Sequence, residues 1–258
     1  NASAKKTTLI ALDENMQLPS EKVFELNLSG LRSALNSAPK RMSSSQSQNI
    51  ISIPNADGNL EQFKVFENSI MEAELAAKYP EIKSYVGIGI DNPLSIAYFS
   101  VSPLGFKSMV LSPNKSTEFI EPISADLTTY TVYKKTDKKN AFTPFECSVI
   151  DKAAASPTMM LRNADDSVLR TFRLAVSCTG EYATYFGGTK AQALAAINAS
   201  MTRVNGVFEN DFAIRMVLIA NNDLVLYTNA STDPYTTSYN SQLQSRTIKT
   251  QNSFSNYF

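Results

Sequence analysis

The sequence predicts an α+β protein. Its first part is β-rich, antiparallel and either sandwich-like or barrel-like, and the strand–helix–strand start of an α/β domain follows. Three observations predict this: a series of short alternating apolar runs separated by turn residues, two short helical patterns among them, and one long amphipathic pattern late in the chain. Successive short strands pair antiparallel, whereas a long helix between two strands produces a parallel pair.

The first part opens with a strand pattern at residues 23–28 and a short helix at residues 31–38. We expect Ser29 to cap this helix and Pro39 to end it, because Ser satisfies free amides at a helix start and Pro cannot continue a helix. Further along the chain, turn residues separate five strand patterns, at residues 84–90, 95–101, 106–111, 118–123 and 130–134.

A hairpin and a second short helix lie between these strands. The strand patterns at residues 50–53 and 62–66 flank an Asp-Gly pair ending at Gly58, which suits a turn with positive φ. The second helix is predicted at residues 69–79, where Ser69 and Glu72 have the spacing of a capping box.

Residues 136–168 show no sustained periodicity and are rich in Lys, Asp, Ala, Ser and Pro, which is typical of an interdomain linker. We therefore expect a β-rich domain at residues 1–135, a linker with an activation cleavage at residues 136–168, and a further domain from residue 169. Basic residues offer cutting sites to a trypsin-like protease at Lys138, Lys139, Lys152, Arg162 and Arg170.

The last part begins with a strand pattern at residues 169–179 and a long helix at residues 189–209, with Thr189 as its cap. Strand patterns at residues 212–219 and 224–227 follow. Two or three strands covered by one helix leave a face of the sheet open, so residues 169–258 are expected to be an incomplete domain.

Composition excludes several classes of function. Basic and acidic residues balance at 24 each without a block of like charge, which argues against a nucleic-acid partner. No run reaches the roughly 20 apolar residues of a membrane span, so no membrane-spanning helix is expected. The chain contains no His, so it cannot by itself supply a catalytic or metal-binding imidazole. Frequent Thr, Ser, Asn and Tyr favour a secreted or cell-surface protein.

Several segments together resemble a known family. In the last part these are L-R-T-F-R-L-A-V at residues 169–176, C-T-G-E-Y at 178–182, G-G-T at 187–189 and M-T-R-V-N-G-V-F-E at 201–209. The first part contributes S-I-M at residues 69–71, E-L-A-A-K-Y-P-E-I-K-S-Y at 74–85 and S-P-L-G-F at 102–106. The pattern, over roughly residues 20–240, resembles the pro-segment and catalytic start of secreted bacterial reprolysin-like (M12B-type) zinc metalloproteases, which are metzincins.

The resemblance implies a zymogen whose pro-segment keeps the enzyme latent and aids its folding. Zinc is expected in the complete enzyme, held by H-E-x-x-H-x-x-G-x-x-H, but not in this chain alone, which lacks that motif. The expected partners are the remainder of the catalytic domain and protein or peptide substrates. The ending Asn256-Tyr257-Phe258 resembles a segment that precedes the zinc helix in relatives, so the chain is expected to stop just short of it.

Two residues are candidate metal ligands. The resemblance places Cys147 at the end of the pro-segment, where its thiolate could occupy the fourth zinc position and maintain latency. A buried side chain, or a disulfide with Cys178 or with another cysteine, is the alternative for Cys147. The resemblance also makes Glu181 a candidate calcium ligand, although a solvated Glu at a strand end is the alternative.

Two other functions remain open from the sequence alone. The absence of His also fits a non-catalytic relative that keeps the scaffold for binding or inhibition. Loops rich in Tyr and Asn also fit an exported β-rich binding or adhesion module.

Overall fold

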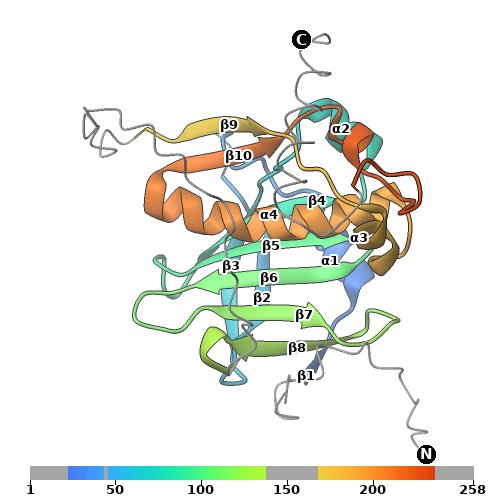
Figure 1. Ribbon diagram of the computed structural model, residues 1–258. Helices are drawn as coiled ribbons and strands as arrows, with labels where there is room; N and C mark the ends of the chain where they lie inside the picture. The colour runs from blue at the N-terminus through green and yellow to red at the C-terminus, as the bar shows by residue number, and fades with distance from the viewer. Residues whose placement is uncertain (1–22, 44–45, 138–167, 236–258) are drawn as a thin grey trace, which may run out of the picture.

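The computed structural model describes residues 23–43, 46–137 and 168–235. In these residues an eight-stranded antiparallel sheet packs with a two-stranded parallel sheet and four α-helices, which confirms the predicted α+β class (Figure 1). The large sheet contains β1 Val23–Glu25, β2 Ile50–Pro54, β3 Leu60–Glu67, β4 Lys83–Gly89, β5 Ile96–Ser102, β6 Gly105–Leu111, β7 Glu118–Pro122 and β8 Thr129–Lys134. The other elements are α1 Leu28–Leu35, α2 Ala73–Lys78, β9 Arg170–Leu174, α3 Gly180–Tyr185, α4 Lys190–Phe212 and β10 Ile214–Leu218.

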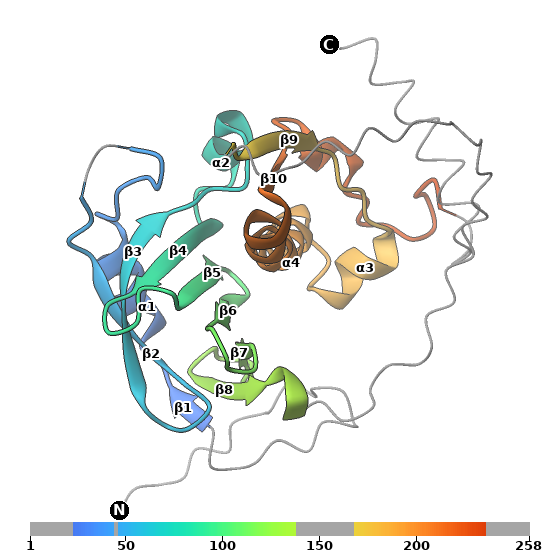
Figure 2. The same cartoon turned by 90° about the vertical axis from the view of Figure 1, so that its left-hand side faces the viewer.

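The large sheet has the strand order β1-β8-β7-β6-β5-β4-β3-β2, so β2 to β8 form a continuous meander. The predicted β2–β3 hairpin is confirmed, and Gly58 has the positive φ of 87° that its turn requires. The sheet curls around α1, as Figure 2 shows, which gives the barrel-like alternative of the prediction in an open form.

Helices cover both faces of the middle of this sheet. On one face Phe99 belongs to a core with Leu35 of α1, and its ring stacks 5.2 Å from that of Tyr85. The opposite face presents Tyr98 and Met109 to α4. Because neither face meets solvent, β5 is buried almost throughout instead of alternating between buried and exposed.

Helix α4 lies between the two sheets. It begins as predicted, with the Thr189 hydroxyl accepting from the Gln192 amide at 3.2 Å. Every residue from 193 to 199 is buried, as in a helix covered on all sides. Figure 2 shows α4 end-on, with the large sheet on one side, β9 and β10 on another, and α3 nearby. The large sheet thus covers α4 and not the small sheet, and β9 itself remains largely exposed.

The β9–α4–β10 unit confirms the predicted strand–helix–strand start, with β9 and β10 parallel from the Ile214–Arg170 pair onward. A segment of the first part joins this small sheet. Met71 bridges Leu218 in parallel, with the Leu218 amide donating to the Ile70 carbonyl at 2.7 Å. The edge of β10 is therefore paired with residues that precede it by more than a hundred positions.

The predicted start of α1 was wrong. Strand β1 ends at Glu25, and α1 begins at Leu28, three residues earlier than expected. Asn27, not Ser29, is the cap, because its Oδ1 accepts from the Gly30 amide at 2.9 Å.

The predicted capping box was also wrong. Ser69 Oγ accepts from the nearby Met71 amide at 3.3 Å, and α2 begins only at Ala73. Pairing with β10 holds residues 70 and 71 extended, so tertiary contact overrides the local signal. The Glu72 carboxylate instead accepts from the Ala220 amide at 2.8 Å and pairs with Arg173.

The predicted strand at residues 224–227 is wrong: its first two residues end a 3₁₀-helix, η3 Asn222–Val225, and Leu226 forms an isolated bridge with Cys178. The apolar pattern there reflects burial, since Val225 and Leu226 both lie in the interior. Helix α3 was not predicted at all, and Thr179 caps it. Among the described residues, no helix has the length and hydropathy needed to cross a bilayer.

Candidate functional site

A group of specific polar contacts lies where α4 and β10 meet the first part of the chain. We refer to residues 23–137 as the sheet segment and residues 168–235 as the helix segment. The surface between them contains a buried hydroxyl–amide cluster, several ion pairs and a shared apolar core.

The hydroxyl–amide cluster joins β4 to the middle of α4. Asn198 Nδ2 donates to Ser84 Oγ at 2.9 Å, and Ser84 Oγ also lies 2.9 Å from Thr202 Oγ1. Thr202 in turn donates to the Asn198 carbonyl at 2.7 Å. All three side chains are buried. A satisfied polar group in an apolar contact fixes one relative position of the two surfaces, because any shift leaves it without partners.

The ion pairs include a buried carboxylate held by two guanidinium groups. Glu209 near the end of α4 pairs with Arg41 of the sheet segment and with Arg215 of β10, whose Nη1 lies 3.4 Å from the carboxylate. Arg215 also donates to Asn68 Oδ1 and, at 2.6 Å, to the Ser69 carbonyl. Burial lowers the pKa of Arg215, and Glu209 opposes this effect. These contacts link the two segments through charges that have left water.

Two further ion pairs cross the same surface. Arg203 of α4 donates to Glu121 Oε1 at 2.7 Å and to the Ser108 carbonyl at 3.2 Å. Arg173 of β9 binds Glu72, with Nε 2.5 Å from Oε1, and this hydrogen bond holds the pKa of Glu72 below its ordinary value. The surface therefore has charge contacts on both sides of its apolar centre.

The helix segment also has a shallow groove of about 370 Å³ next to α4. Burial raises the pKa of the Cys178 thiol at its floor, and there is no His in the chain to act as a base. Cys178 is thus a buried, protonated thiol. The groove is lined by Val176, Ser177, Cys178, Thr179, Tyr182, Ile197, Ser200 and Met201.

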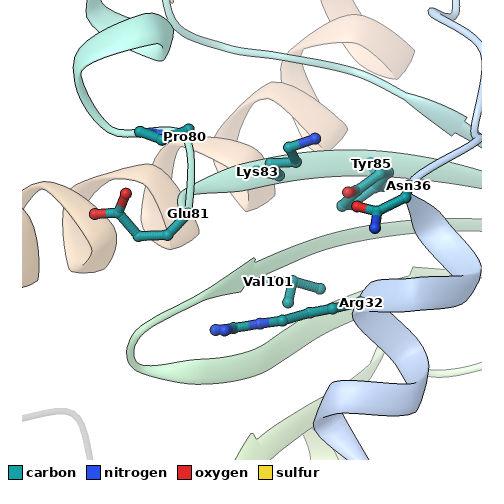
Figure 3. A pocket seen from close by; sticks show the side chains of 7 residues that line it. All are labelled: Arg32, Asn36, Pro80, Glu81, Lys83, Tyr85 and Val101. Atoms are coloured by element: carbon teal, nitrogen blue, oxygen red, sulfur yellow. The ribbon is translucent and has the colours of Figure 1, made fainter.

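A smaller hollow of about 90 Å³ lies on the sheet segment (Figure 3). It is lined by Arg32 of α1 and Asn36 at the end of that helix, together with Glu81 from the turn before β4 and Lys83 at the start of β4. Arg32 is engaged with the Ser102 carbonyl at 2.8 Å, and burial raises the pKa of Tyr85 to about 12, which keeps the phenol protonated. The hollow has no paired acid and base for catalysis.

The structure locates only part of the sites predicted from the sequence. Lys138, Lys139, Cys147, Lys152 and Arg162 lie outside the described residues. Cys147 as a zinc ligand, its alternative disulfide with Cys178, and cleavage at Lys152 or Arg162 therefore stay predictions.

The other two predicted sites are placed by the structure. Arg170 is paired with Ile214 in the small sheet, so a protease could cut after it only once β9 had opened. Glu181 is exposed in the first turn of α3, and its role as a calcium ligand stays a prediction. No group of three His, Cys, Asp or Glu side chains that could hold a metal occurs among the described residues.

Sequence reasoning missed the sheet–helix surface. It treated Asn198, Thr202 and Arg215 as ordinary members of a helix and a strand, although Asn and Thr in the middle of an apolar helix face were a usable signal. Buried polar side chains on a helix need partners, and those partners had to come from another part of the chain.

The parallel β9–α4–β10 unit, with its capped and buried central helix, lies within the part of the chain that is similar to a metallopeptidase family. Residues 168–255 match the model of the family described as Metallo-peptidase family M12B Reprolysin-like, so this part of the chain is reprolysin-like. No curated protein and no solved structure gave a significant match.

The family implies zinc in the complete enzyme and peptides as substrates. The residues of this chain do not fit the metal, because a site of three imidazoles cannot be built from a sequence without His. This chain therefore does not itself supply the imidazoles that such a zinc site requires.

Proposed function

We propose that this chain is the pro-segment and first catalytic part of a secreted or cell-surface bacterial zinc metalloendopeptidase. In this proposal the sheet segment keeps the enzyme latent and assists its folding. The observation that carries the proposal is that the large sheet covers the central helix of the reprolysin-like segment. A pro-segment that assists folding must make native contacts with the domain it serves, and this one contributes to that domain's interior.

Shared apolar burial supports the folding role. One core contains Leu75 and Ile82 of the sheet segment together with Leu194 and Leu218 of the helix segment. Leu75 and Leu194 are completely buried. Burying a side chain of this size contributes about 1.5–3 kcal/mol, so the helix segment gains stability from residues outside it.

The expected reaction is peptide hydrolysis, with a metal-activated water as nucleophile. Zinc would be held by ligands outside this chain. The scaffold of α4, β9 and β10 would help to position those ligands. Cys147 as a latency ligand and Glu181 as a calcium ligand are further parts of the proposal.

The test is to read the coding sequence beyond Phe258 and to assay its full product. We expect an H-E-x-x-H-x-x-G-x-x-H segment, bound zinc, and casein hydrolysis that appears only after cleavage between residues 138 and 167. A stop codon directly after Phe258, or a full product that binds no zinc, would refute the proposal. Cys147→Ser in the full product tests the latency ligand, and unchanged latency would remove Cys147 from it.

A non-catalytic relative is the second candidate, and the absence of His from the sequence favours it. It would keep the sheet–helix surface but show neither zinc nor hydrolysis in the full product. The same assay therefore separates the two candidates.

A further inference from the structure

We infer that the sheet segment stays bound to the helix segment after the chain between them is cut, so that cleavage alone does not release the pro-segment. The role of this continued binding in enzyme activation rests on the proposed function. The association itself does not, because it follows from the contacts between residues 23–137 and 168–235. Release would then need a second event, such as digestion or displacement of the sheet segment.

The first support is backbone pairing at the edge of the small sheet. The Leu218 amide donates to the Ile70 carbonyl at 2.7 Å, and the Glu72 amide donates to the Leu218 carbonyl at 2.9 Å. The sheet segment thus adds a short strand to β10, in the manner of peptides that bind by strand addition. Cutting the chain between residues 138 and 167 leaves both hydrogen bonds in place.

The second support is close packing between α4 and the large sheet. Gly206 faces Tyr98 and Met109 so closely that a Cβ atom at this position would lie 2.7 Å from both side chains. Together with the shared core around Leu75, this contact resembles a domain interior more than a transient interface. Separation would expose apolar surface on both segments.

The third support is that several buried polar groups have hydrogen-bond partners in the other segment. Asn198 of α4 donates to Ser84 of β4, Thr202 Oγ1 lies 2.9 Å from the same hydroxyl, and Arg215 binds Asn68 and the Ser69 carbonyl. Partial separation removes these partners while the groups are still buried, which is costly. The two segments therefore cannot separate gradually at low energetic cost, and we expect their dissociation to be slow.

The experiment uses the full chain with a recognition site for a sequence-specific protease inserted between residues 138 and 167. After complete cleavage, verified by mass in denaturant, the sample is passed over a size-exclusion column in native buffer. We expect both fragments in one peak at the mass of the uncut chain, with separation only in denaturant. Two separate peaks in native buffer would overturn the inference.

A matched pair of variants tests whether the α4–sheet contact holds the fragments together. Gly206→Ala adds a methyl group against Tyr98 and Met109, whereas Asn210→Ala raises helix propensity at an exposed position of the same helix without touching the sheet. Both substitutions favour the helix itself, so a loss seen only in Gly206→Ala reports the contact with the sheet and not a weaker helix. We expect Gly206→Ala to shift separation of the cut fragments to a lower urea concentration and Asn210→Ala to leave it unchanged.

Equal behaviour of the two variants would show that this contact does not hold the fragments together, which would overturn the argument from α4. None of these readouts depends on zinc or hydrolysis. Co-elution without peptidase activity in the full product would refute the proposed function and leave this inference intact. Separate elution of the two fragments, with peptidase activity in the full product, would refute this inference and leave the proposed function intact.

Discussion

At the scale of single residues, Arg215 is a buried charge with partners in both segments. Its guanidinium is largely buried, binds Asn68 and the Ser69 carbonyl, and faces Glu209. The same side chain thus joins β10 to the sheet segment and balances a carboxylate that is only 4% exposed.

Arg215→Ala should destabilise the chain by about 3 kcal/mol, because it removes one partner of a buried ion pair and leaves Glu209 with less compensation. Urea unfolding of the full chain measures this. The control is Lys78→Ala, which breaks the more exposed pair with Asp223 and should cost less than about 1 kcal/mol. Similar losses in the two variants would contradict a special role for Arg215.

The ion pair between Glu72 and Arg173 should make the stability of the chain depend on pH. Its hydrogen bond with Arg173 lowers the folded-state pKa below the ordinary value of 4.5. The stabilisation is therefore fully present above that ordinary pKa and is lost as the pH falls through the lower folded pKa. Glu72→Gln should thus reduce the drop in melting temperature on acidification below pH 4.5.

The measurement is a series of thermal melts of the wild type and Glu72→Gln across that acid range. Glu81→Gln serves as the control, because it changes an exposed carboxylate in the turn between α2 and β4. A variant that loses stability on acidification as steeply as the wild type would show that the pair contributes nothing to the pH dependence.

At the scale of elements, two helices start at other residues than the sequence predicts. Helix α2 lost its capping box because β10 holds residues 70 and 71 extended, while α1 used Asn27 in place of Ser29. Asn and Ser are nearly equivalent as caps, so the sequence could not choose between two candidates two positions apart.

Asn27→Ala should destabilise the chain by about 1 kcal/mol, because the Gly30 amide loses its acceptor. Ser29→Ala should have a smaller effect, since Ser29 lies inside the helix and its hydroxyl only donates to Asn27 Oδ1. Urea unfolding of both variants distinguishes the caps. A larger loss of stability for Ser29→Ala than for Asn27→Ala would support the helix start predicted from the sequence.

At the scale of the whole molecule, the two segments share an interior. Leu75 lies on α2, yet it packs in a core built mainly by α4 and its neighbours. The described parts of the chain should therefore unfold together as one cooperative unit.

Leu75→Ala should cost about 2–5 kcal/mol, because it leaves a cavity in a fully buried site. It should also reduce hydrogen-exchange protection in α4, in the other segment. Leu94→Ala removes the same atoms at a position that is 70% exposed and should change neither quantity. Unchanged protection in α4 after Leu75→Ala would argue against a shared core.

The sequence by itself determined the α+β class, the β2–β3 hairpin, the antiparallel meander and the β9–α4–β10 unit, and it suggested the reprolysin-like family. These features follow from local periodicity and turn chemistry, which neighbouring residues encode. The candidate site depended more on the fold: Asn198 and Thr202 on the apolar side of α4 were a signal in the sequence, but the sequence alone could not show which surface supplies their partners.

Only the tertiary structure decided that α4 is covered by the large sheet, that Ile70 and Met71 extend the small sheet, and that Asn198 and Arg215 find partners in the other segment. The physical reason is that these contacts join residues more than a hundred positions apart. Local propensity cannot encode which distant surface will supply a missing partner, whereas the energy of burying polar and apolar groups selects that surface once the chain is compact.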